Sequence, residues 1–361
     1  MVQTVRVGLV STSWWAEMMF LPALASHPQA ELAAVCGRNR QRTEEVAARY
    51  SIPAVYTDYR QMFEEGRLDA VIVAAPDDLH YPITMAALDA GLHVLCEKPL
   101  AMNAPQALAM AERAAAAGVK HMVMYTFRWM PHLQYARDLI DQGYLGRVYH
   151  CEFRYLMGYA RSREFIWRLD RGRANGILGD IGSHAIDTAR WLVGEISAVS
   201  AQLGAFVERP GADGGPGDPA NDCALLLLRF KDGGQGVIQA SGVAHLPGDA
   251  IGQQVRLYGS GGTLEIDIPP FGPAGAATLR GAASHEVQMQ TLAVPPIYWE
   301  AADPADPMSV FTKNSAGARQ FVDAILLDTA PVPDFLDGYR AQLVIDAALA
   351  ANASGCTVTI V

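Results

Sequence analysis

The sequence lacks the features that mark several protein classes. Its few cysteines form no CxxC pair and show no cysteine–histidine spacing, which favours reduced thiols over a disulfide framework or a zinc site. The five cysteines are Cys36, Cys96, Cys151, Cys223 and Cys356. No apolar run reaches membrane-spanning length, and no basic, apolar leader precedes the first strand-like segment. We therefore expect a cytoplasmic protein with no bound metal and no membrane partner.

Basic residues are in the minority. Lysine and arginine total 28 against 38 aspartate and glutamate residues, which gives a formal net charge of −10. A broad nucleic-acid-binding face needs an excess of positive charge, so we expect no nucleic-acid partner. The 361 residues are 50% hydrophobic and 18% charged, as in an ordinary globular enzyme. This length allows two or three domains.

Strand and helix patterns alternate between residues 5 and 124. The expected strands are Val5–Val10, Glu31–Cys36, Ala54–Tyr56, Leu68–Ala74, His93–Cys96 and Lys120–Met124. The expected helices are Trp15–Ser26, Arg40–Tyr50, Tyr59–Glu65, Tyr81–Ala90 and Ala104–Ala117. Short strands joined by helical crossovers predict a parallel sheet that is covered on both faces.

The pattern changes after about residue 125. A helix over Trp129–Gln142 is followed by strand-like runs that turn signals separate. These runs are Arg147–Met157, Ile196–Val207, Cys223–Phe230, Gly236–Val243, Gln254–Tyr258, Thr263–Ile268 and Glu286–Leu292. Two late helices, Ser309–Leu327 and Phe335–Ala351, close the chain. We predict an α/β protein with domains at 1–125 and 126–361, the second built on a large, mostly antiparallel sheet, and a site in the crevice where they meet.

The turn after the first strand stands where a dinucleotide-binding fingerprint is expected. The usual GxGxxG lets the backbone approach a pyrophosphate at the start of a helix. Here serines replace the first two glycines, and only the tolerant last position, Ala16, is kept. Serines still offer backbone N–H groups and hydroxyls, although they adopt positive φ at a cost. The cofactor-binding residues predicted here are Gly8, Ser11, Thr12, Ser13, Trp14 and Trp15. A plain strand-to-helix turn is the alternative, and the two tryptophans could instead pack the helix against the sheet.

The end of the second strand bears on the identity of the dinucleotide. NAD sites usually carry an aspartate or glutamate there, which binds the ribose 2′-hydroxyl. This chain has Gly37 followed by Arg38, which leaves room for a 2′-phosphate and attracts it. We predict NADP(H) as the preferred cofactor, with NAD(H) possible. The alternative is that Arg38 is a solvated charge at the start of a helix.

Glu97, Lys98 and Pro99 directly follow the fifth strand. In an open α/β sheet, ligands bind beyond the carboxyl ends of the strands. Proline disfavours helical geometry at the preceding residue, so Lys98 is expected on an extended turn that faces a crevice. The alternative is that Glu97 and Lys98 are ordinary solvated charges on a loop.

A second polar cluster runs from Asp180 to Asp187. On a helix, Asp180 and His184 share one face, where a carboxylate raises the basicity of an imidazole and fixes its tautomer. Asp187 could also reach His184. A capping and packing pair is the structural alternative. Arginines and aromatic residues suit a polyhydroxylated ligand, and Arg128 and Trp167 are the predicted substrate-binding residues of this kind.

These motifs together resemble the glucose–fructose oxidoreductase/inositol dehydrogenase/MocA (Gfo/Idh/MocA) family of NAD(P)-dependent oxidoreductases. The resemblance covers essentially the whole chain. The matching segments are Gly8 with its turn, 75–80, 97–99, 125–131, 143–148 and 179–187. The resemblance implies an N-terminal Rossmann dinucleotide-binding domain and a C-terminal α/β domain whose large open sheet often builds dimers or tetramers.

The resemblance also implies roles for individual residues. Lys98 resembles the family lysine that contacts both substrate and cofactor, and Asp180 and His184 resemble its catalytic acid–histidine pair. Glu97 is similar to the residue that orients this neighbourhood. The loop beside the nicotinamide ribose corresponds to Ala75, Pro76, Asp77 and His80. The implied substrate is a sugar, a polyol or a related compound, contacted by Lys98, Arg128, Trp167, Asp180 and His184.

The predicted activity is hydride transfer between the nicotinamide and a carbinol or carbonyl carbon. His184 or Lys98 could move the proton of the substrate oxygen, and the sequence leaves both open. Two rival functions are an NAD-assisted glycoside-cleaving enzyme of the same fold and a non-catalytic cofactor sensor. A homodimer or homotetramer is expected from the resemblance.

Overall fold

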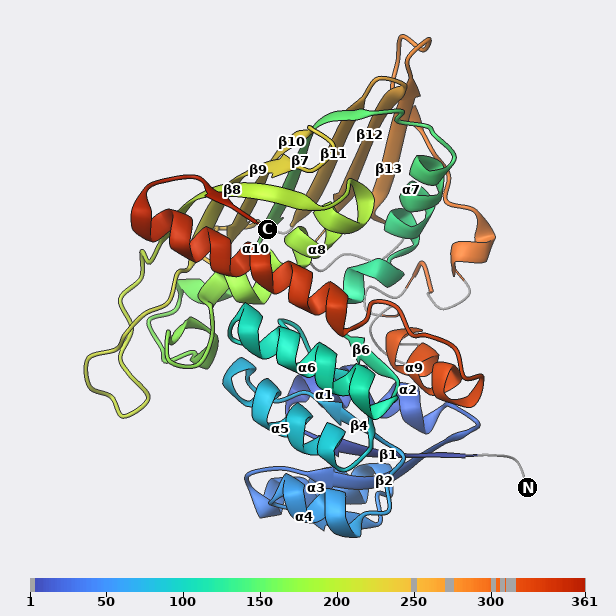
Figure 1. Ribbon diagram of the computed structural model, residues 1–361, viewed down its shortest axis with the longest axis vertical. Helices are drawn as coiled ribbons and strands as arrows, with labels where there is room; N and C mark the ends of the chain where they lie inside the picture. Colours follow the sequence, from blue (N-terminus) through green and yellow to red (C-terminus); the bar gives the residue numbers. More distant parts are fainter. Residues whose placement is uncertain are drawn as a thin grey trace. The chain divides into compact units, whose positions relative to one another are not determined.

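A six-stranded parallel sheet forms the core of the N-terminal part of the chain in the computed structural model (Figure 1). The structure describes residues 4–247, 252–269, 276–299, 303–305, 309 and 316–360. The strands are β1 (Val5–Val10), β2 (Ala30–Cys36), β3 (Ala54–Tyr56), β4 (Ala70–Val73), β5 (His93–Cys96) and β6 (His121–Val123). Their order is β3-β2-β1-β4-β5-β6, with every pair parallel. This is the Rossmann order, which reverses between β1 and β4.

Helices connect these strands. They are α1 (Trp14–Met19), α2 (Leu21–Ala25), α3 (Arg40–Tyr50), α4 (Tyr59–Glu65), α5 (Asp77–Asp89) and α6 (Ala104–Ala117). The single helix predicted over Trp15–Ser26 is wrong, because the structure breaks it at Phe20. Pro22 lies in the first turn of α2 and lacks the N–H that a continuous helix would need there. None of the helices in the described residues is both long and apolar enough to cross a membrane.

The chain divides into two compact units, each of which is made of two separate segments of the sequence. The first comprises Met1–Tyr125 with Ser309–Arg340, and the second Thr126–Met308 with Ala341–Val361. The late segment joins the first unit because α9 (Ala316–Leu326) packs against α2, β1 and β5. The predicted break at residue 125 matches one boundary of the units, whereas the predicted domain 126–361 contains a segment that packs with the first unit.

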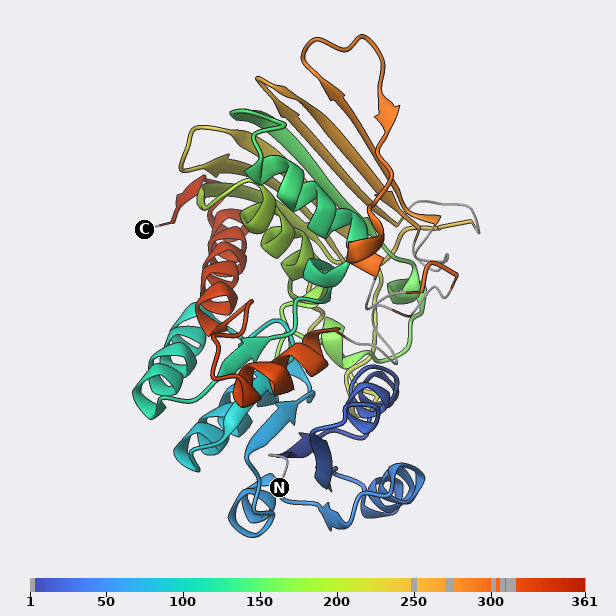
Figure 2. The same cartoon turned by 90° about the vertical axis from the view of Figure 1, so that its right-hand side faces the viewer.

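The second unit is built on a nine-stranded sheet, whose strands run diagonally in Figure 2. Its order is β14-β13-β12-β11-β7-β10-β9-β8-β15, and among the described strands only β7 and β10 pair in parallel. The strands are β7 (Val148–Leu156), β8 (Ile196–Gly204), β9 (Cys223–Phe230), β10 (Gln235–Ser241), β11 (Gln253–Gly259), β12 (Gly262–Ile268), β13 (Thr278–Ala283), β14 (Gln290–Thr291) and β15 (Val358–Thr359). The prediction of a mostly antiparallel sheet is confirmed.

One face of this sheet is buried by helices. Helix α7 (Pro131–Asp141) packs on β12 and β13, and α8 (Ser183–Leu192) packs on β7 and β10. Along β9, Leu226 and Leu228 are buried, whereas Leu225 and Leu227 are 43% and 62% exposed. The alternation of side chains along a strand thus leaves apolar residues on the second face. The last helix is α10 (Phe335–Ser354), where Asn352 accepts a hydrogen bond from the Leu203 amide.

Several predicted elements differ in detail. The predicted strand Glu286–Leu292 shortens to β14, while β13 and β15 were not predicted. The helix predicted from Trp129 begins at Pro131, after a 3-10 turn, η1 (Thr126–Trp129). Asp180 lies on a π-helical turn, η4 (Leu178–Gly182), which continues directly into α8. The predicted helix Ser309–Leu327 lies partly outside the described residues, and α9 covers its later part.

Candidate active site

The turn between β1 and α1 lies where the order of the parallel sheet reverses. Ser13 caps α1, because its hydroxyl accepts a hydrogen bond from the Ala16 amide at 3.2 Å. The Ser13 amide in turn donates to the Ser11 hydroxyl at 3.1 Å, and the two hydroxyls are 3.0 Å apart. The serines that replace the fingerprint glycines therefore stabilise the turn with their own side chains. Trp14, the first residue of α1, is 67% exposed.

The two glycines predicted for cofactor binding have different surroundings. Gly8 lies inside β1, where an added Cβ would come within 2.5 Å of the Leu68 side chain. Its lack of a side chain therefore serves packing, and the structure places it outside the turn. At Gly37 an added Cβ would come within 2.6 Å of Thr12. Gly37 therefore allows the ends of β1 and β2 to approach closely beside the turn.

Arg38 follows Gly37 and is exposed. Its neighbours on α3 are engaged by carboxylates, since Arg40 pairs with Glu44 at 2.9 Å and Arg42 pairs with Glu17. Within the described part of the chain, no carboxylate pairs with the Arg38 guanidinium. Its charge is therefore available to a ligand at the end of β2, where a dinucleotide carries its adenosine ribose.

Glu97 and Lys98 leave β5 on a turn that Trp15 contacts. The Trp15 indole N–H donates to the Glu97 carboxylate at 2.7 Å, and the Lys98 amide donates to its other oxygen at 3.1 Å. Glu97 is 6% exposed, and this burial raises its pKa, although the neighbouring Lys98 and the indole donor act in the opposite direction. The Lys98 side chain is half-buried, and its peptide bond to Pro99 is cis. Trp15 thus joins the turn after β1 to the turn after β5.

The loop after β4 is tied to the same turn by His80, on α5. Its ring nitrogens lie 2.8 Å from the Pro99 carbonyl oxygen and 2.8 Å from the Ala75 carbonyl oxygen. Ala75 and Pro76 are half-buried, and His80 is fully buried. The predicted residues 75, 76, 80, 97 and 98 are therefore one connected group at the carboxyl ends of β4 and β5.

In the second unit, Asp180 is held by two side chains from the segment after β7. The Tyr159 hydroxyl donates to its carboxylate, and the Arg168 guanidinium lies 3.4 Å from it. Burial and the charge of Asp180 raise the pKa of Tyr159 well above its usual value, so the phenol remains a donor. Sequence reasoning missed Tyr159, which lies 21 residues before Asp180 on a 3-10 turn, η2 (Tyr159–Arg161).

His184 lies one turn further along the same helical segment, and its ring is packed by aromatic residues. The Phe127 ring meets it edge-to-face at 4.8 Å, and the Tyr155 ring lies 6.3 Å away. His184 is 7% exposed. Burial, and then the charge of Asp180, raise the pKa of Tyr155. The two tyrosines and the acid–histidine pair thus form one cluster on the helix-covered side of the sheet.

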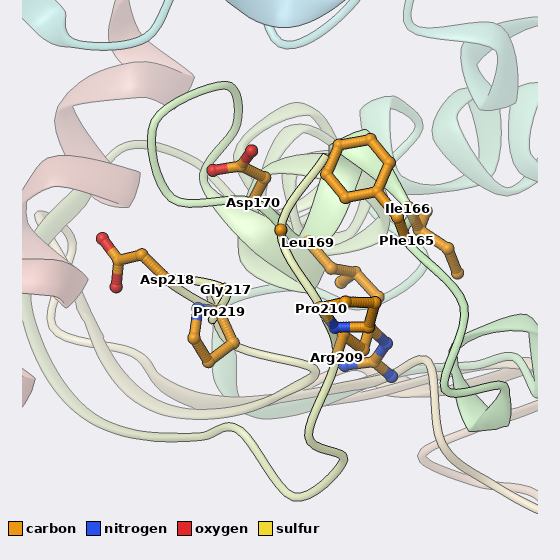
Figure 3. A pocket seen from close by; sticks show the side chains of 10 residues that line it. Phe165, Ile166, Leu169, Asp170, Arg209, Pro210, Gly217, Asp218 and Pro219 are labelled. Atoms are coloured by element: carbon orange, nitrogen blue, oxygen red, sulfur yellow. The ribbon is translucent and has the colours of Figure 1, made fainter. Parts of the chain in front are cut away.

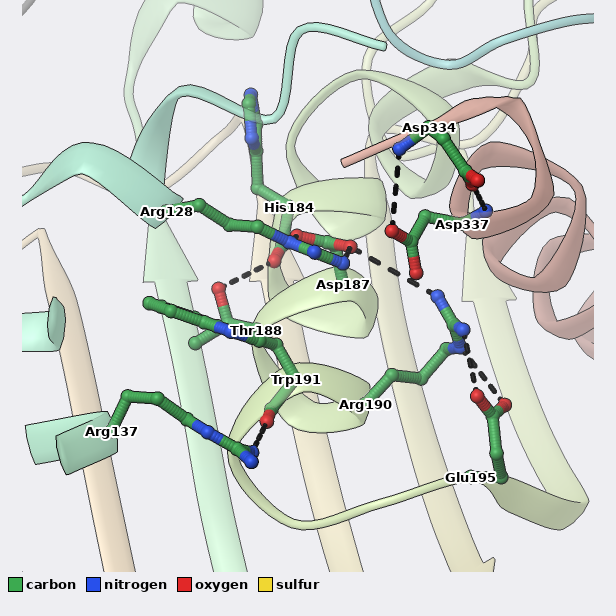
Figure 4. A network of polar contacts seen from close by, with 10 residues as sticks. All are labelled: Arg128, Arg137, His184, Asp187, Thr188, Arg190, Trp191, Glu195, Asp334 and Asp337. Carbon is green, nitrogen blue, oxygen red and sulfur yellow. Dashed lines mark hydrogen bonds and ion pairs between the residues drawn. The ribbon is translucent and has the colours of Figure 1, made fainter. Parts of the chain in front are cut away.

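Arg128, on η1, forms a buried ion pair with Asp187, on α8 (Figure 4). Arg128 donates from Nε at 2.9 Å and from Nη2 at 2.7 Å to the two carboxylate oxygens. Arg190 lies 4.0 Å from the same carboxylate and is itself held by Glu195 at 2.8 Å. Arg128, which was predicted to bind substrate, therefore pairs with Asp187. Asp187, which was predicted to reach His184, pairs with arginines.

Trp167 lies under the Arg168 guanidinium, 4.3 Å from its ring centre. This places the predicted substrate-binding tryptophan next to the arginine that contacts Asp180. A neighbouring cavity of about 10 Å³ is lined by Phe165, Leu169 and Arg209, among others (Figure 3). A second cavity beside His184 measures about 20 Å³. Each has room for about one water molecule and is too small for a sugar.

The arrangement carries two sets of proton-handling groups. The first unit presents an amine on a turn beside a dinucleotide-type loop, and the second presents a histidine and a carboxylate supported by phenols. An amine can polarise a carbonyl or alkoxide oxygen, while a histidine can give or take a proton at neutral pH. The Rossmann order, the turn at its reversal and the exposed arginine after β2 fit a dinucleotide cofactor.

Comparison with known proteins identifies the family. Residues 5–125 match the model of an oxidoreductase family with an NAD-binding Rossmann fold, and residues 133–265 match the GFO/IDH/MocA C-terminal domain. Levoglucosan dehydrogenase of Pseudarthrobacter phenanthrenivorans is 29% identical, over 96% of this chain and 95% of that protein. The scyllo-inositol 2-dehydrogenase (NADP(+)) of Bacillus subtilis is 30% identical, over 56% of this chain and 55% of that protein.

Solved structures extend the similarity to the whole fold. A levoglucosan dehydrogenase in complex with NADH and levoglucosan superposes with a TM-score of 0.89 at 28% identity, covering 99% of this chain and all of that one. An oxidoreductase domain protein from Kribbella flavida gives a TM-score of 0.88 at 29% identity, with both chains fully covered. The chain therefore belongs to the GFO/IDH/MocA family of NAD-binding oxidoreductases, as the sequence motifs indicated.

Proposed function

We propose that this protein transfers a hydride between a nicotinamide dinucleotide and a carbinol or carbonyl carbon of a sugar or polyol. The observation that carries the proposal is the near-full-length similarity to a dehydrogenase with NADH and levoglucosan bound. The groups that the reaction needs support it. Lys98 follows β5, and Asp180 and His184 form one cluster with Tyr159.

Each group has a distinct task in the proposed reaction. In the oxidative direction the substrate hydroxyl gives its proton to His184, and its carbon becomes a carbonyl as the hydride leaves. A dinucleotide held at the turn after β1 would supply the acceptor for that hydride. Lys98 donates a hydrogen bond to the substrate oxygen and stabilises the negative charge that develops there. Asp180 orients His184, and Tyr159 and Arg168 hold the Asp180 carboxylate in place. Lys98 as the proton-transfer group is the alternative.

The cofactor proposed as preferred is NADP(H), with NAD(H) as a usable second. Arg38 supports this preference, because its charge has no carboxylate partner in the described residues and lies at the end of β2. The relatives differ, since the levoglucosan dehydrogenase structure contains NADH, whereas the scyllo-inositol enzyme is named for NADP(+). The proposed cofactor contacts are Ser11, Thr12, Ser13, Trp14, Trp15, Gly37, Arg38, Ala75, Pro76, Glu97 and Lys98. His80 was also predicted to bind the cofactor, but its side chain is completely buried and its ring nitrogens face backbone carbonyls, so we propose that it supports this loop from behind.

Two further properties belong to the proposal. The exposed apolar residues Leu225, Leu227 and Val237 lie on the open face of the nine-stranded sheet. Large exposed apolar surfaces commonly mark protein interfaces, so we expect a homodimer or homotetramer that pairs these faces. We also expect the enzyme in the cytoplasm.

The first test is a fluorescence titration of cofactor-stripped protein with NADPH and with NADH. Tighter binding of NADPH supports the role of Arg38, and a screen of sugars, polyols and levoglucosan with the preferred cofactor then tests hydride transfer. Binding of neither dinucleotide would contradict the oxidoreductase proposal. Tightly held NAD with turnover in the absence of added cofactor would instead favour NAD-assisted glycoside cleavage.

The second test addresses Lys98. Lys98→Met removes the amine but keeps a side chain of similar length, and we expect kcat to fall by about 10²–10⁴-fold with little change in cofactor affinity. Lys231→Met, in the exposed turn after β9, is the matched control and retains wild-type kcat. Equal kcat in wild type and Lys98→Met would remove Lys98 from the chemistry.

A further inference from the structure

The His80 ring has an unusual set of neighbours for a buried histidine. Its side chain is completely buried, at 0% exposure. Nδ1 lies 2.8 Å from the Pro99 carbonyl oxygen, and Nε2 lies 2.8 Å from the Ala75 carbonyl oxygen. Both are normal lengths for a hydrogen bond from N–H to oxygen.

These two contacts constrain the protonation of the ring. A carbonyl oxygen only accepts hydrogen bonds, so each ring nitrogen must donate. A neutral imidazole carries one N–H and one bare nitrogen, which would point its lone pair at an oxygen 2.8 Å away. Only the imidazolium form, which carries N–H on both nitrogens, satisfies both contacts.

The charged groups around the ring are compatible with a cation. Cys96, the last residue of β5, contacts His80. The charge of His80 also acts to lower the pKa of the buried Glu97 carboxyl. Asp77 lies one turn earlier on α5 and is 5% exposed, and Lys98 follows Glu97 on the turn. Burial alone lowers the pKa of His80, but Cys96 and the two carbonyl oxygens outweigh it and raise the pKa to about 9.

We propose that His80, protonated on both ring nitrogens at neutral pH, is a positioning residue that fastens the loop after β4 to the Lys98-Pro99 turn. One N–H holds the Ala75 carbonyl, in the segment proposed to contact the nicotinamide ribose. The other holds the carbonyl of Pro99, the residue next to the proposed catalytic lysine. The ring therefore fixes the distance between the cofactor loop and the lysine. Its positioning role rests on the proposed function, whereas its charge state does not.

The charge state is tested by NMR of protein labelled with ¹⁵N at histidine. His80 should show two protonated ring nitrogens at pH 7, and its resonance is identified by its disappearance in His80→Gln. His27 is the internal control, since its Nδ1 accepts from the Gln29 amide at 3.1 Å and its Nε2 faces Asp323 at 3.1 Å. It should show one bare and one protonated nitrogen. A bare nitrogen on His80, with Cys96 donating to it, would overturn the proposal whatever the enzyme's activity.

The positioning role is tested by kinetics of His80→Gln. An amide retains a donor for one carbonyl but carries no titrating proton. We expect kcat to fall by up to about 100-fold, because small misplacements of reacting groups are costly, while KM changes little. Wild-type kcat should also decline as the pH rises through the His80 titration seen by NMR, and this limb should be missing in the variant. A variant with unchanged kcat and an unchanged pH profile would refute the positioning role. If His80→Gln does not fold, the wild-type enzyme decides alone, and a kcat that stays constant through the His80 titration would refute the positioning role.

Discussion

Two buried histidines, His80 in the first unit and His132 in the second, have pKa values shifted in opposite directions. His80 in the first unit is completely buried, but Cys96 and then the carbonyl oxygens at both ring nitrogens raise its pKa to about 9. His132 in the second unit is 5% exposed and meets the Trp299 ring edge-to-face at 5.5 Å. Burial lowers the pKa of His132 to about 4, although a backbone hydrogen bond with Ala277 acts in the opposite direction. Burial alone therefore favours the neutral ring, and at His80 the neighbouring Cys96 together with acceptors on both sides reverses that preference.

The same contrast applies to carboxylates. The first unit holds Glu97 with an indole N–H and a backbone amide, both of which are neutral donors. The second unit holds Asp187 with the guanidinium of Arg128. A neutral donor does not cancel the negative charge of the carboxylate, so more distant groups must do so. An arginine carries the opposite charge and cancels it directly. The two units should therefore respond differently when one partner is removed.

The largest effect on stability is expected at the Arg128–Asp187 pair. Asp187→Asn leaves the Arg128 cation buried without its counter-charge, and removing one partner of a buried pair costs about 3–5 kcal/mol. Chemical denaturation measures this loss. Asp141→Asn is the matched control, because Asp141 also accepts two hydrogen bonds from one arginine, Arg137, but is 53% exposed. Its expected cost is about 0–1 kcal/mol. Equal losses for the two variants would contradict the importance of burial.

The next largest effect is the loss of folding stability at low pH that protonation of His132 should cause. Its pKa is 6.5 in the unfolded chain and about 4 in the folded one, so the unfolded state binds the proton more readily between these values. Full stability is present above pH 6.5 and is lost as the pH falls towards 4, by about 3 kcal/mol at 1.36 kcal/mol per unit. His80 has the opposite sign, so its contribution is lost as the pH rises from 6.5 through about 9.

Denaturation midpoints measured across this pH range test both signs. His132→Leu should reduce the slope on the acid side and leave the alkaline side unchanged. The exposed His150→Gln serves as its control and should alter neither side. An unchanged acid slope in His132→Leu would show that other groups dominate acid unfolding.

A smaller effect is expected from Trp15→Phe. This variant keeps an aromatic ring but removes the donor to the Glu97 carboxylate, and a hydrogen bond to a buried charged group contributes about 1–3 kcal/mol. Trp14→Phe is the control for stability, because Trp14 is 67% exposed and its side chain should contribute less than about 0.5 kcal/mol. If both variants unfold at the same denaturant concentration, the indole bond does not stabilise the turn after β5.

The contrast between the units also explains what the sequence could predict. The parallel sheet could be predicted because its strands are short and fully apolar, as in Ala70–Val73. Such strands can be recognised from their own residues, without knowing which strand they pair with. In the second unit, β13 was missed because Gly281 interrupts its short run, and β15 because a two-residue strand carries no pattern. Both strands exist because β12 and β8 pair with them. Such pairing over long sequence separations leaves little local signal.

The candidate site shows the same limit. Lys98, Asp180 and His184 were predicted because short motifs carry them. The Tyr159–Asp180 and Trp15–Glu97 contacts join residues 21 and 82 positions apart, and only the folded chain brings them together. Substrate binding by Arg128 stays a prediction, and its ion pair with Asp187, 59 positions away, supplies the counter-charge that a buried guanidinium needs.

The smallest effect is expected at Arg38, where the charge is exposed rather than buried. Arg38→Gln should leave the free energy of unfolding unchanged within about 0.5 kcal/mol, as is usual at the surface. The same change should weaken NADPH binding about tenfold, equal to about 1.4 kcal/mol, through loss of one charge-assisted contact with the 2′-phosphate. NADH lacks this phosphate, so its affinity should not change. Arg40→Gln removes a neighbouring arginine that already pairs with Glu44, and should change neither affinity. If Arg38→Gln weakened NADH and NADPH equally, the arginine would contact a part that both dinucleotides share, and the preference for NADP(H) would have no basis in this residue.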